Sequence, residues 1–159
     1  AIVHVHDETV RGMNEGRDVH TLMREIRLPP EFEVGEGYGK VSWSVRAIWE
    51  HYAGWFHHRS TTELYDEPQA SIHSDLLELA GGTDPLVARA RKHLAKGDAV
   101  KALHLLDIVL GEEQGHRAAL ETAQQAHHLL VQDTDNFWLA SWLRNQGEQL
   151  GTRLQQTEG

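Results

Sequence analysis

The sequence predicts an all-α domain of about seven to eight helices. Apolar residues recur at intervals of three and four along most of the 159-residue chain, which is typical of amphipathic helices. The alternation of apolar and polar residues that indicates a half-buried strand is not apparent in any segment. A chain of about 150 residues buries roughly 70% of its unfolded surface, so we expect a substantial core.

Two helices are predicted at the beginning of the chain. The first covers residues 3–13 and ends at Gly16, because glycine readily adopts the left-handed backbone of a helix C-cap. The second covers residues 19–26 and begins after Asp18, whose carboxylate suits an N-cap. The prolines at 29–30 stop this helix, because proline cannot continue the hydrogen-bonded ladder.

A flexible glycine-rich loop at residues 33–40 precedes the third predicted helix. This helix covers residues 42–55, with Ser42 as its expected N-cap. The following stretch, residues 57–69, is polar and irregular. The apolar face of the third helix combines aromatic and aliphatic residues: Val45, Ile48, Trp49, Tyr52 and Phe56.

The second half of the chain, residues 70–159, is almost entirely helical in pattern. Glycines at 81–82 end a short helix, and Asp84 with Pro85 begins the next, because proline fits the first helical turn. Residues 155–159 are expected to fray. The predicted helices cover residues 76–80, 85–96, 99–110, 115–130 and 136–147.

A weak internal repeat lies within these helices. Residues 86–110 follow the layout of a tetratricopeptide repeat, with a small residue at the turn between two antiparallel helices. Residues 119–130 begin a second repeat, so about one and a half repeats are visible. Because an array needs about three repeats for stability, we favour packed helical hairpins over a peptide-binding solenoid.

The composition excludes several classes of protein. Fifteen basic residues against 24 acidic ones give a net charge of −9, which argues against nucleic acid and against anionic membranes as partners. The absence of cysteine excludes disulfides, thiolate nucleophiles and iron–sulfur clusters. No run approaches the ~20 apolar residues of a membrane span, so we expect a soluble protein, either cytoplasmic or periplasmic.

Twelve histidines suggest a metal site, but their spacing does not support one. His4 and His6 lie on a predicted helix, where side chains two residues apart point in different directions. Glu113 and His116 match one ligand motif of di-iron helical bundles, which require two such motifs and two further glutamates. We also find no nucleophile elbow and no phosphate-binding loop, so the residues alone predict no catalytic site and no metal site.

Several motifs nonetheless occur in a specific order. They are HDETVRGMNEG at 6–16, LPP at 28–30, YGKVS at 38–42 and RAIWEHYAGWF at 46–56, followed by the helices from Gly97 to ASWLRN at 140–145. This succession covers nearly the whole chain. It resembles the dimerisation domain of alkyl sulfatases, which are zinc-dependent members of the metallo-β-lactamase superfamily.

The resemblance implies a helper domain rather than a complete enzyme. In that family an upstream metallo-β-lactamase domain holds zinc, and the helical domain pairs two protomers and closes over the active site. A sterol-carrier-like domain often follows. Residues 1–159 would then be a single dimerisation domain, with an N-terminal part at 1–69 and a hairpin part at 70–159. Its partners would be a second copy and its own upstream zinc domain, and the chain itself would hold no cofactor and no catalytic residue.

The resemblance also identifies residues expected to face the substrate: Tyr38, Trp43, Arg46 and Trp55. The family usually has His and Asn where this chain has Trp43 and Ser44, and tryptophan cannot carry a positive charge. A parent hydrolase that acts on a less anionic, non-sulfate substrate therefore stays an alternative. The chain has no initiator methionine, so we expect it to be a fragment of that parent.

Three hypotheses follow for the chain. The leading one is a homodimerisation domain that lines part of a neighbouring hydrolase pocket, which suits its five tryptophans. The second is a monomeric tetratricopeptide-like module with a peptide groove near residues 90–126. The third is a small metalloenzyme, which would bind zinc or iron tightly as an isolated chain.

Overall fold

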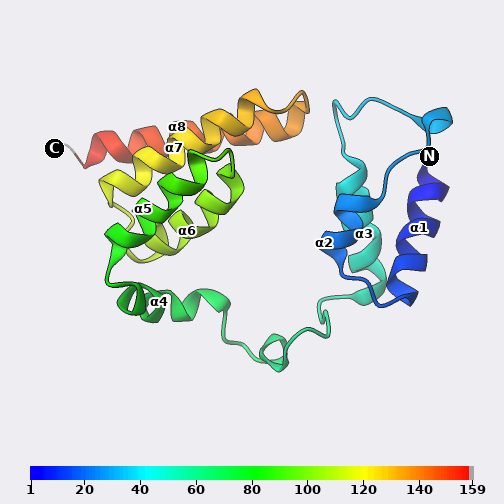
Figure 1. Cartoon of the computed structure of the whole chain (residues 1–159), viewed down its shortest axis with the longest axis horizontal. Coiled ribbons are helices and arrows are strands. Elements are labelled where there is room, and N and C mark those ends of the chain that lie inside the picture. Colours follow the sequence, from blue (N-terminus) through cyan, green and yellow to red (C-terminus); the bar gives the residue numbers. More distant parts are fainter. Residues whose placement is uncertain (158–159) are drawn as a thin grey trace. The chain divides into compact units, whose positions relative to one another are not determined.

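The computed structural model describes residues 1–157 and confirms the all-α prediction. Across these residues the regular structure consists of eight α-helices and three short 3-10 helices, without a strand (Figure 1). The chain divides into two compact units. Unit 1 contains residues 1–66 and 135–138, and unit 2 contains residues 67–134 and the chain from Leu139 onward.

Unit 1 is built from α1 (Ile2–Asn14), α2 (Val19–Glu25) and α3 (Val41–Ala53). The helices pack because each presents an apolar stripe to the same small core. Leu22 and Val45 are fully buried at its centre, and partly buried side chains such as Met13 and Ile48 pack around them. The buried core residues are Val5, Val19, Leu22, Ile26, Val45 and Trp49.

The predicted cap of α2 is confirmed. The carboxylate of Asp18 accepts hydrogen bonds from the backbone N–H of His20 at 3.0 Å and of Thr21 at 3.1 Å. The Thr21 hydroxyl donates to the same carboxylate at 2.5 Å. These hydrogen bonds favour the charged form, the hydroxyl of Thr21 most, and they lower the pKa of Asp18 below its ordinary value.

The predicted cap of α3 is wrong. The helix begins at Val41, with Lys40 rather than Ser42 as the N-cap residue. The carboxylate of Glu36 accepts the Val41 N–H at 2.7 Å, so a residue five positions upstream does what a capping serine would do. The other end of the helix is set by Gly54, whose φ of 67° requires a residue without a Cβ atom.

Unit 2 contains a layer of antiparallel helices, α5 (Thr83–Leu94), α6 (Ala99–Glu112) and α7 (Arg117–Gln132), with the short α4 (His73–Ala80) packed on α5 and α6 (Figure 1). Small side chains at the contacts let these helices approach closely. The hairpins agree with the predicted packing, and their tetratricopeptide-like layout stays a prediction. The fully buried alanines are Ala90, Ala102, Ala119 and Ala126.

The last helix differs most from expectation. We predicted an end at residue 147, but α8 continues from Phe137 to Gln156, so Gln155 is helical and does not fray there. Gly147 and Gly151 lie within α8 without ending it, and both face α7. A Cβ atom at Gly151 would lie 2.8 Å from Nε2 of Gln124. The final residues of the segment expected to fray, 158–159, lie outside the described residues.

The tryptophans are mostly not core residues. Trp49 is 8% exposed, whereas Trp43, Trp55, Trp138 and Trp142 expose between 38% and 72% of their surface. Four of the five indoles are therefore at least partly exposed to water in the described chain. Among residues 1–157, none of the helices is long and apolar enough to cross a membrane.

Candidate functional site

The glycine-rich loop that carries Tyr38 is held by a segment about 100 residues further along the chain. The Asn136 amide donates to the carbonyl oxygens of Glu36 at 2.5 Å and Gly39 at 3.3 Å, and it is buried. The Phe137 N–H donates to the Gly37 carbonyl at 2.6 Å. The rings of Tyr38 and Phe137 lie 5.7 Å apart, so unit 1 presents two adjacent aromatic side chains at this loop.

Tyr38 also borders an apolar pocket of about 290 Å³ in unit 1, which we call the loop pocket. Its ring is 75% exposed, so it forms a wall of the pocket rather than its floor. The predominantly apolar lining suits an aliphatic or aromatic group better than a free anion. The walls come from α1, α3 and the loop, and they include Val5, Leu28, Val34, Tyr38 and Ile48.

Trp43 and Arg46 do not lie on the side of α3 that lines the loop pocket. Helical spacing places both residues away from Val45, which is fully buried in the core. The Arg46 guanidinium Nε lies 2.8 Å from a carboxylate oxygen of Glu50, one turn along the same helix. The Glu50 carboxylate therefore already neutralises part of the positive charge of Arg46 that a substrate anion would contact.

The four residues expected to face substrate therefore do not share one pocket in this chain. Trp55 follows α3, is 72% exposed and contacts Phe56 with ring centroids 5.9 Å apart. Tyr38 lines the loop pocket, but Trp43, Arg46 and Trp55 do not.

A chain of hydrogen-bonding groups that sequence analysis missed lies between α1 and α3. His6 Nδ1 is 2.9 Å from a carboxylate oxygen of Asp7, and His6 Nε2 is 2.9 Å from the hydroxyl of Tyr52. The carboxylate fixes the imidazole so that Nε2 accepts from the phenol. Tyr52 lies 46 residues away, and only the packing of the two helices brings the pair together.

The histidines do not form a metal centre within residues 1–157, where no group of three His, Asp or Glu side chains is placed to hold an ion. Those singled out in the sequence have other partners. His4 Nε2 donates to the Arg27 carbonyl at 3.0 Å. His116 caps α7, with Nδ1 accepting the Ala119 N–H at 3.2 Å.

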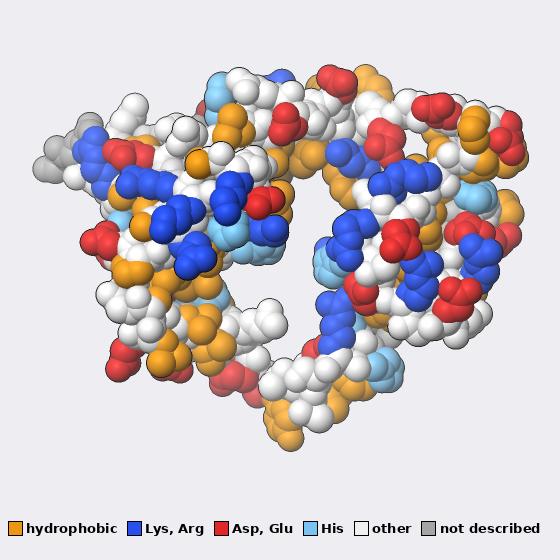
Figure 2. All heavy atoms as spheres, viewed as in Figure 1, with side chains coloured by type: hydrophobic (Ala, Val, Ile, Leu, Met, Phe, Trp, Pro, Cys, Tyr) orange, Lys and Arg blue, Asp and Glu red, His pale blue; other side chains and the backbone are white. Residues whose placement is uncertain are grey.

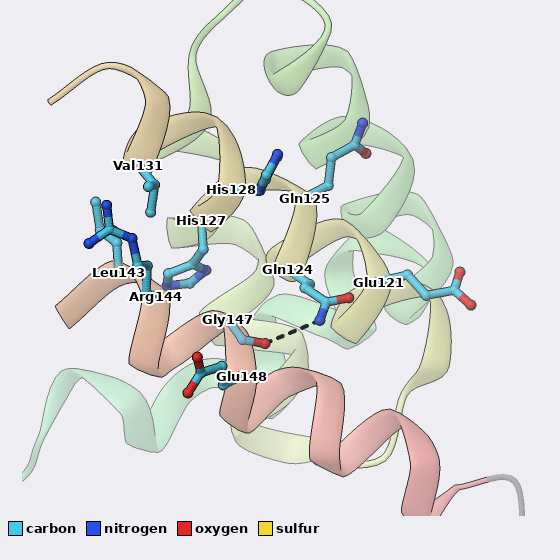
Figure 3. A pocket seen from close by; sticks show the side chains of 10 residues that line it. All are labelled: Glu121, Gln124, Gln125, His127, His128, Val131, Leu143, Arg144, Gly147 and Glu148. Atoms are coloured by element: carbon cyan, nitrogen blue, oxygen red, sulfur yellow. Dashed lines mark hydrogen bonds between the residues drawn. The ribbon is translucent and has the colours of Figure 1, made fainter. Parts of the chain in front are cut away.

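Unit 2 carries a separate groove between α7 and α8, of about 630 Å³ (Figure 3). The Gln124 amide donates to the Gly147 carbonyl at 3.2 Å across it, and His127 Nδ1 donates to the Ala123 carbonyl at 2.8 Å. Sequence analysis missed this groove because its two walls come from different helices and meet only when those helices pack together. The lining is mixed in chemistry and consists of Glu121, Gln124, Gln125, His127, His128, Val131, Leu143, Arg144, Gly147 and Glu148.

Comparison with known proteins identifies similar sequences over nearly the whole chain. The family model described as alkyl sulfatase dimerisation matches residues 19–151. A linear primary-alkylsulfatase from Pseudomonas sp. (strain ATCC 19151) is 29% identical over 160 residues, which cover 98% of this chain and 30% of that protein. An alkyl/aryl-sulfatase from Saccharomyces cerevisiae is 26% identical over 144 residues, or 87% of this chain and 22% of that protein.

Solved structures share the fold. The stereoselective inverting sec-alkylsulfatase of a Pseudomonas species matches with a TM-score of 0.80 and 22% identity. The match covers 99% of this chain and 24% of that protein. The chain thus spans less than a third of the length of the curated relatives and solved structures described above.

Proposed function

This chain belongs to the alkyl sulfatase dimerisation family, and we propose that it joins two copies of its parent protein into a homodimer. The observation that carries this proposal is the exposure of two tryptophans on the last helix. Trp138 and Trp142, one turn apart on α8, expose 59% and 65% of their surface. Aromatic residues are enriched at protein interfaces, and tryptophan is prominent among residues that dominate binding energy. A second copy would remove these indoles from water.

We further propose that the parent is a hydrolase of the metallo-β-lactamase superfamily that cleaves sulfate esters. Support comes from the similarity to full-length alkylsulfatases, of which this chain matches a minor part. The described residues do not fit a zinc site, because they offer no cluster of three ligands. In this proposal zinc is held by an upstream domain, and this chain performs no step of the reaction alone.

In the same proposal Tyr38, Trp43, Arg46 and Trp55 face the substrate of the parent. Tyr38 suits this role through its place on the apolar loop pocket. Trp43 stands where the family usually has histidine, and its neutral indole favours a substrate with less negative charge. The test is Trp43→His in the full-length parent, assayed with sulfate esters and with uncharged esters. Unchanged turnover of both would remove Trp43 from the substrate-facing set.

The first experiment on the homodimer is the molar mass of this chain by light scattering, with metal assayed on the same sample. A homodimer has a mass of about 36 kDa, twice the 18.0 kDa of one chain. A monomer at all concentrations contradicts self-association by this chain and favours the peptide-binding module. Stoichiometric bound zinc or iron contradicts the placement of the metal in another domain.

A further inference from the structure

The short helix α4 has two apolar faces, and only one of them is covered. Leu77 is 9% exposed and belongs to the core that α4 shares with α5 and α6. Ile72 is the residue directly before α4, and Leu76 and Leu79 lie one turn apart on one side of the helix. They expose 51%, 38% and 85% of their surface. We call these three residues the α4 face.

Within unit 2, the residues directly before α4 leave this face exposed. The hydrogen bonds of residues 55–71 join residues within that segment, as in Glu63 N–H to Ser60 O at 3.1 Å and Tyr65 N–H to Thr62 O at 3.2 Å. Tyr65 is itself 74% exposed. Spaced leucines on an exposed helix are the anchors by which a helix binds an apolar surface of a partner.

The charges beside the α4 face indicate what kind of partner it suits. Asp75 and Glu78 are exposed on α4, and none of the ion pairs within residues 1–157 involves them. A partner with small apolar side chains among unpaired basic ones would complement both the leucines and the carboxylates.

The outer side of α5 has these properties. Ala88, Lys92 and Ala95 share one exposed side of the helix, flanked by the exposed Arg89 and Lys96. The three cations make no ion pair within residues 1–157. Lys and Arg side chains gather over this part of unit 2 in Figure 2. We call these five residues the α5 face.

We propose that the α4 face of one copy docks on the α5 face of a second copy. The proposal rests on the proposed homodimer and adds to its interface a contact separate from the exposed tryptophans of α8. Twofold symmetry places the α4 face of each copy on the α5 face of the other, so the contact forms twice. The three apolar residues of the α4 face expose on the order of 300 Å². Because each partner in a stable complex buries about 800 Å², the dimer needs the α5 face and the exposed tryptophans as well.

The apolar part of the contact is tested with Leu79→Lys. Leu79 is 85% exposed, so the substitution leaves the fold intact, which circular dichroism checks. The new cation meets the basic α5 face, and we expect about a tenfold loss at each contact, or about a hundredfold rise in the dimer Kd by sedimentation. Val3→Lys, at an exposed valine of α1, is the matched control and should leave the Kd unchanged.

The charged part is tested by reversal and rescue. Asp75→Lys and Lys92→Glu should each raise the Kd several-fold at low salt, because each places like charges against one another. The double variant restores opposite charges across the symmetric interface and should recover the wild-type Kd. This recovery distinguishes a direct contact from a general effect of net charge, which the control Val3→Lys also measures.

The outcomes separate this inference from the proposed function. A monomeric wild-type chain overturns both. A dimeric wild-type chain whose Kd is unaffected by Leu79→Lys overturns the α4–α5 interface and leaves the homodimer in place. Loss of the dimer in both charge-reversal variants without recovery in the double variant also overturns the α4–α5 contact. A raised Kd in Leu79→Lys together with charge rescue supports it.

Discussion

Gly12 offers a test of how α1 and α2 pack, because two physical effects of Gly12→Ala oppose each other. Within a helix, alanine is favoured over glycine by about 1 kcal/mol. A methyl group at Gly12, however, would overlap Cδ2 of Leu22 and lie 3.1 Å from its Cδ1. Leu22 is fully buried and has no free space to move into. Overpacking of this kind costs about 1–3 kcal/mol, and the severe overlap places it at the upper end.

We therefore expect Gly12→Ala to lower the free energy of unfolding by about 1–2 kcal/mol. The measurement is urea denaturation followed by circular dichroism, with a midpoint lowered by roughly 1 M. Gly147→Ala on α8 is the matched control, because its Cβ atom would lie 3.9 Å from Cβ of His127, an ordinary contact. It should stabilise the chain by up to about 1 kcal/mol. Stabilisation by both substitutions would refute the close approach of Gly12 to Leu22.

Three further predictions concern the caps, the loop and the core. The hydroxyl of Thr21 and two backbone N–H groups lower the pKa of Asp18, so its stabilising effect is complete above its ordinary pKa and is lost as the pH falls through the lowered value. Asparagine does not titrate, so in Asp18→Asn the melting temperature should fall less steeply as the pH is lowered. An unchanged dependence of the melting temperature on pH would contradict this. Asn136→Ala removes the donor to the Gly39 carbonyl and should cost about 1–3 kcal/mol, with faster hydrogen exchange at residues 37–40. Leu106→Ala, at a fully buried position of α6, should cost about 2–5 kcal/mol in thermal unfolding; a loss below 1 kcal/mol would mean that the hairpins are loosely packed.

Features set by neighbours in the sequence were predicted well. Asp18 caps α2 as expected, and Gly16 adopts a positive φ of 72° after α1. Both follow from chemistry within a few residues: a carboxylate reaches the free N–H groups of the next turn, and glycine tolerates the left-handed backbone. The all-α fold follows in the same way from helical periodicity along the chain.

The errors occurred where a distant residue decided the local structure. Ser42 was a reasonable cap, but Glu36 is held in reach of the Val41 N–H by a loop that Asn136 fixes in place. Gly147 looked like the end of a helix because glycine weakens an isolated helix. In the structure α8 continues past it, and the Gly147 carbonyl accepts a hydrogen bond from Gln124 of α7.

The candidate site shows the same division. Tyr38, Trp43, Arg46 and Trp55 could be proposed from the resemblance, because motifs keep their order along the chain. The resemblance could not show that these residues lie on different surfaces. Nor could it show that Tyr38 contacts a ring about 100 residues away. Residues distant in sequence leave no local pattern when they meet in space.

The sequence by itself determined the helices and most of their ends, because backbone preferences and capping act over three or four residues. It also determined the composition: five tryptophans, no cysteine, and more acidic than basic residues. Only the tertiary structure decided which of these are buried. It placed Trp49 in the core and left four indoles and the α4 face exposed, because burial depends on which helix faces pack together.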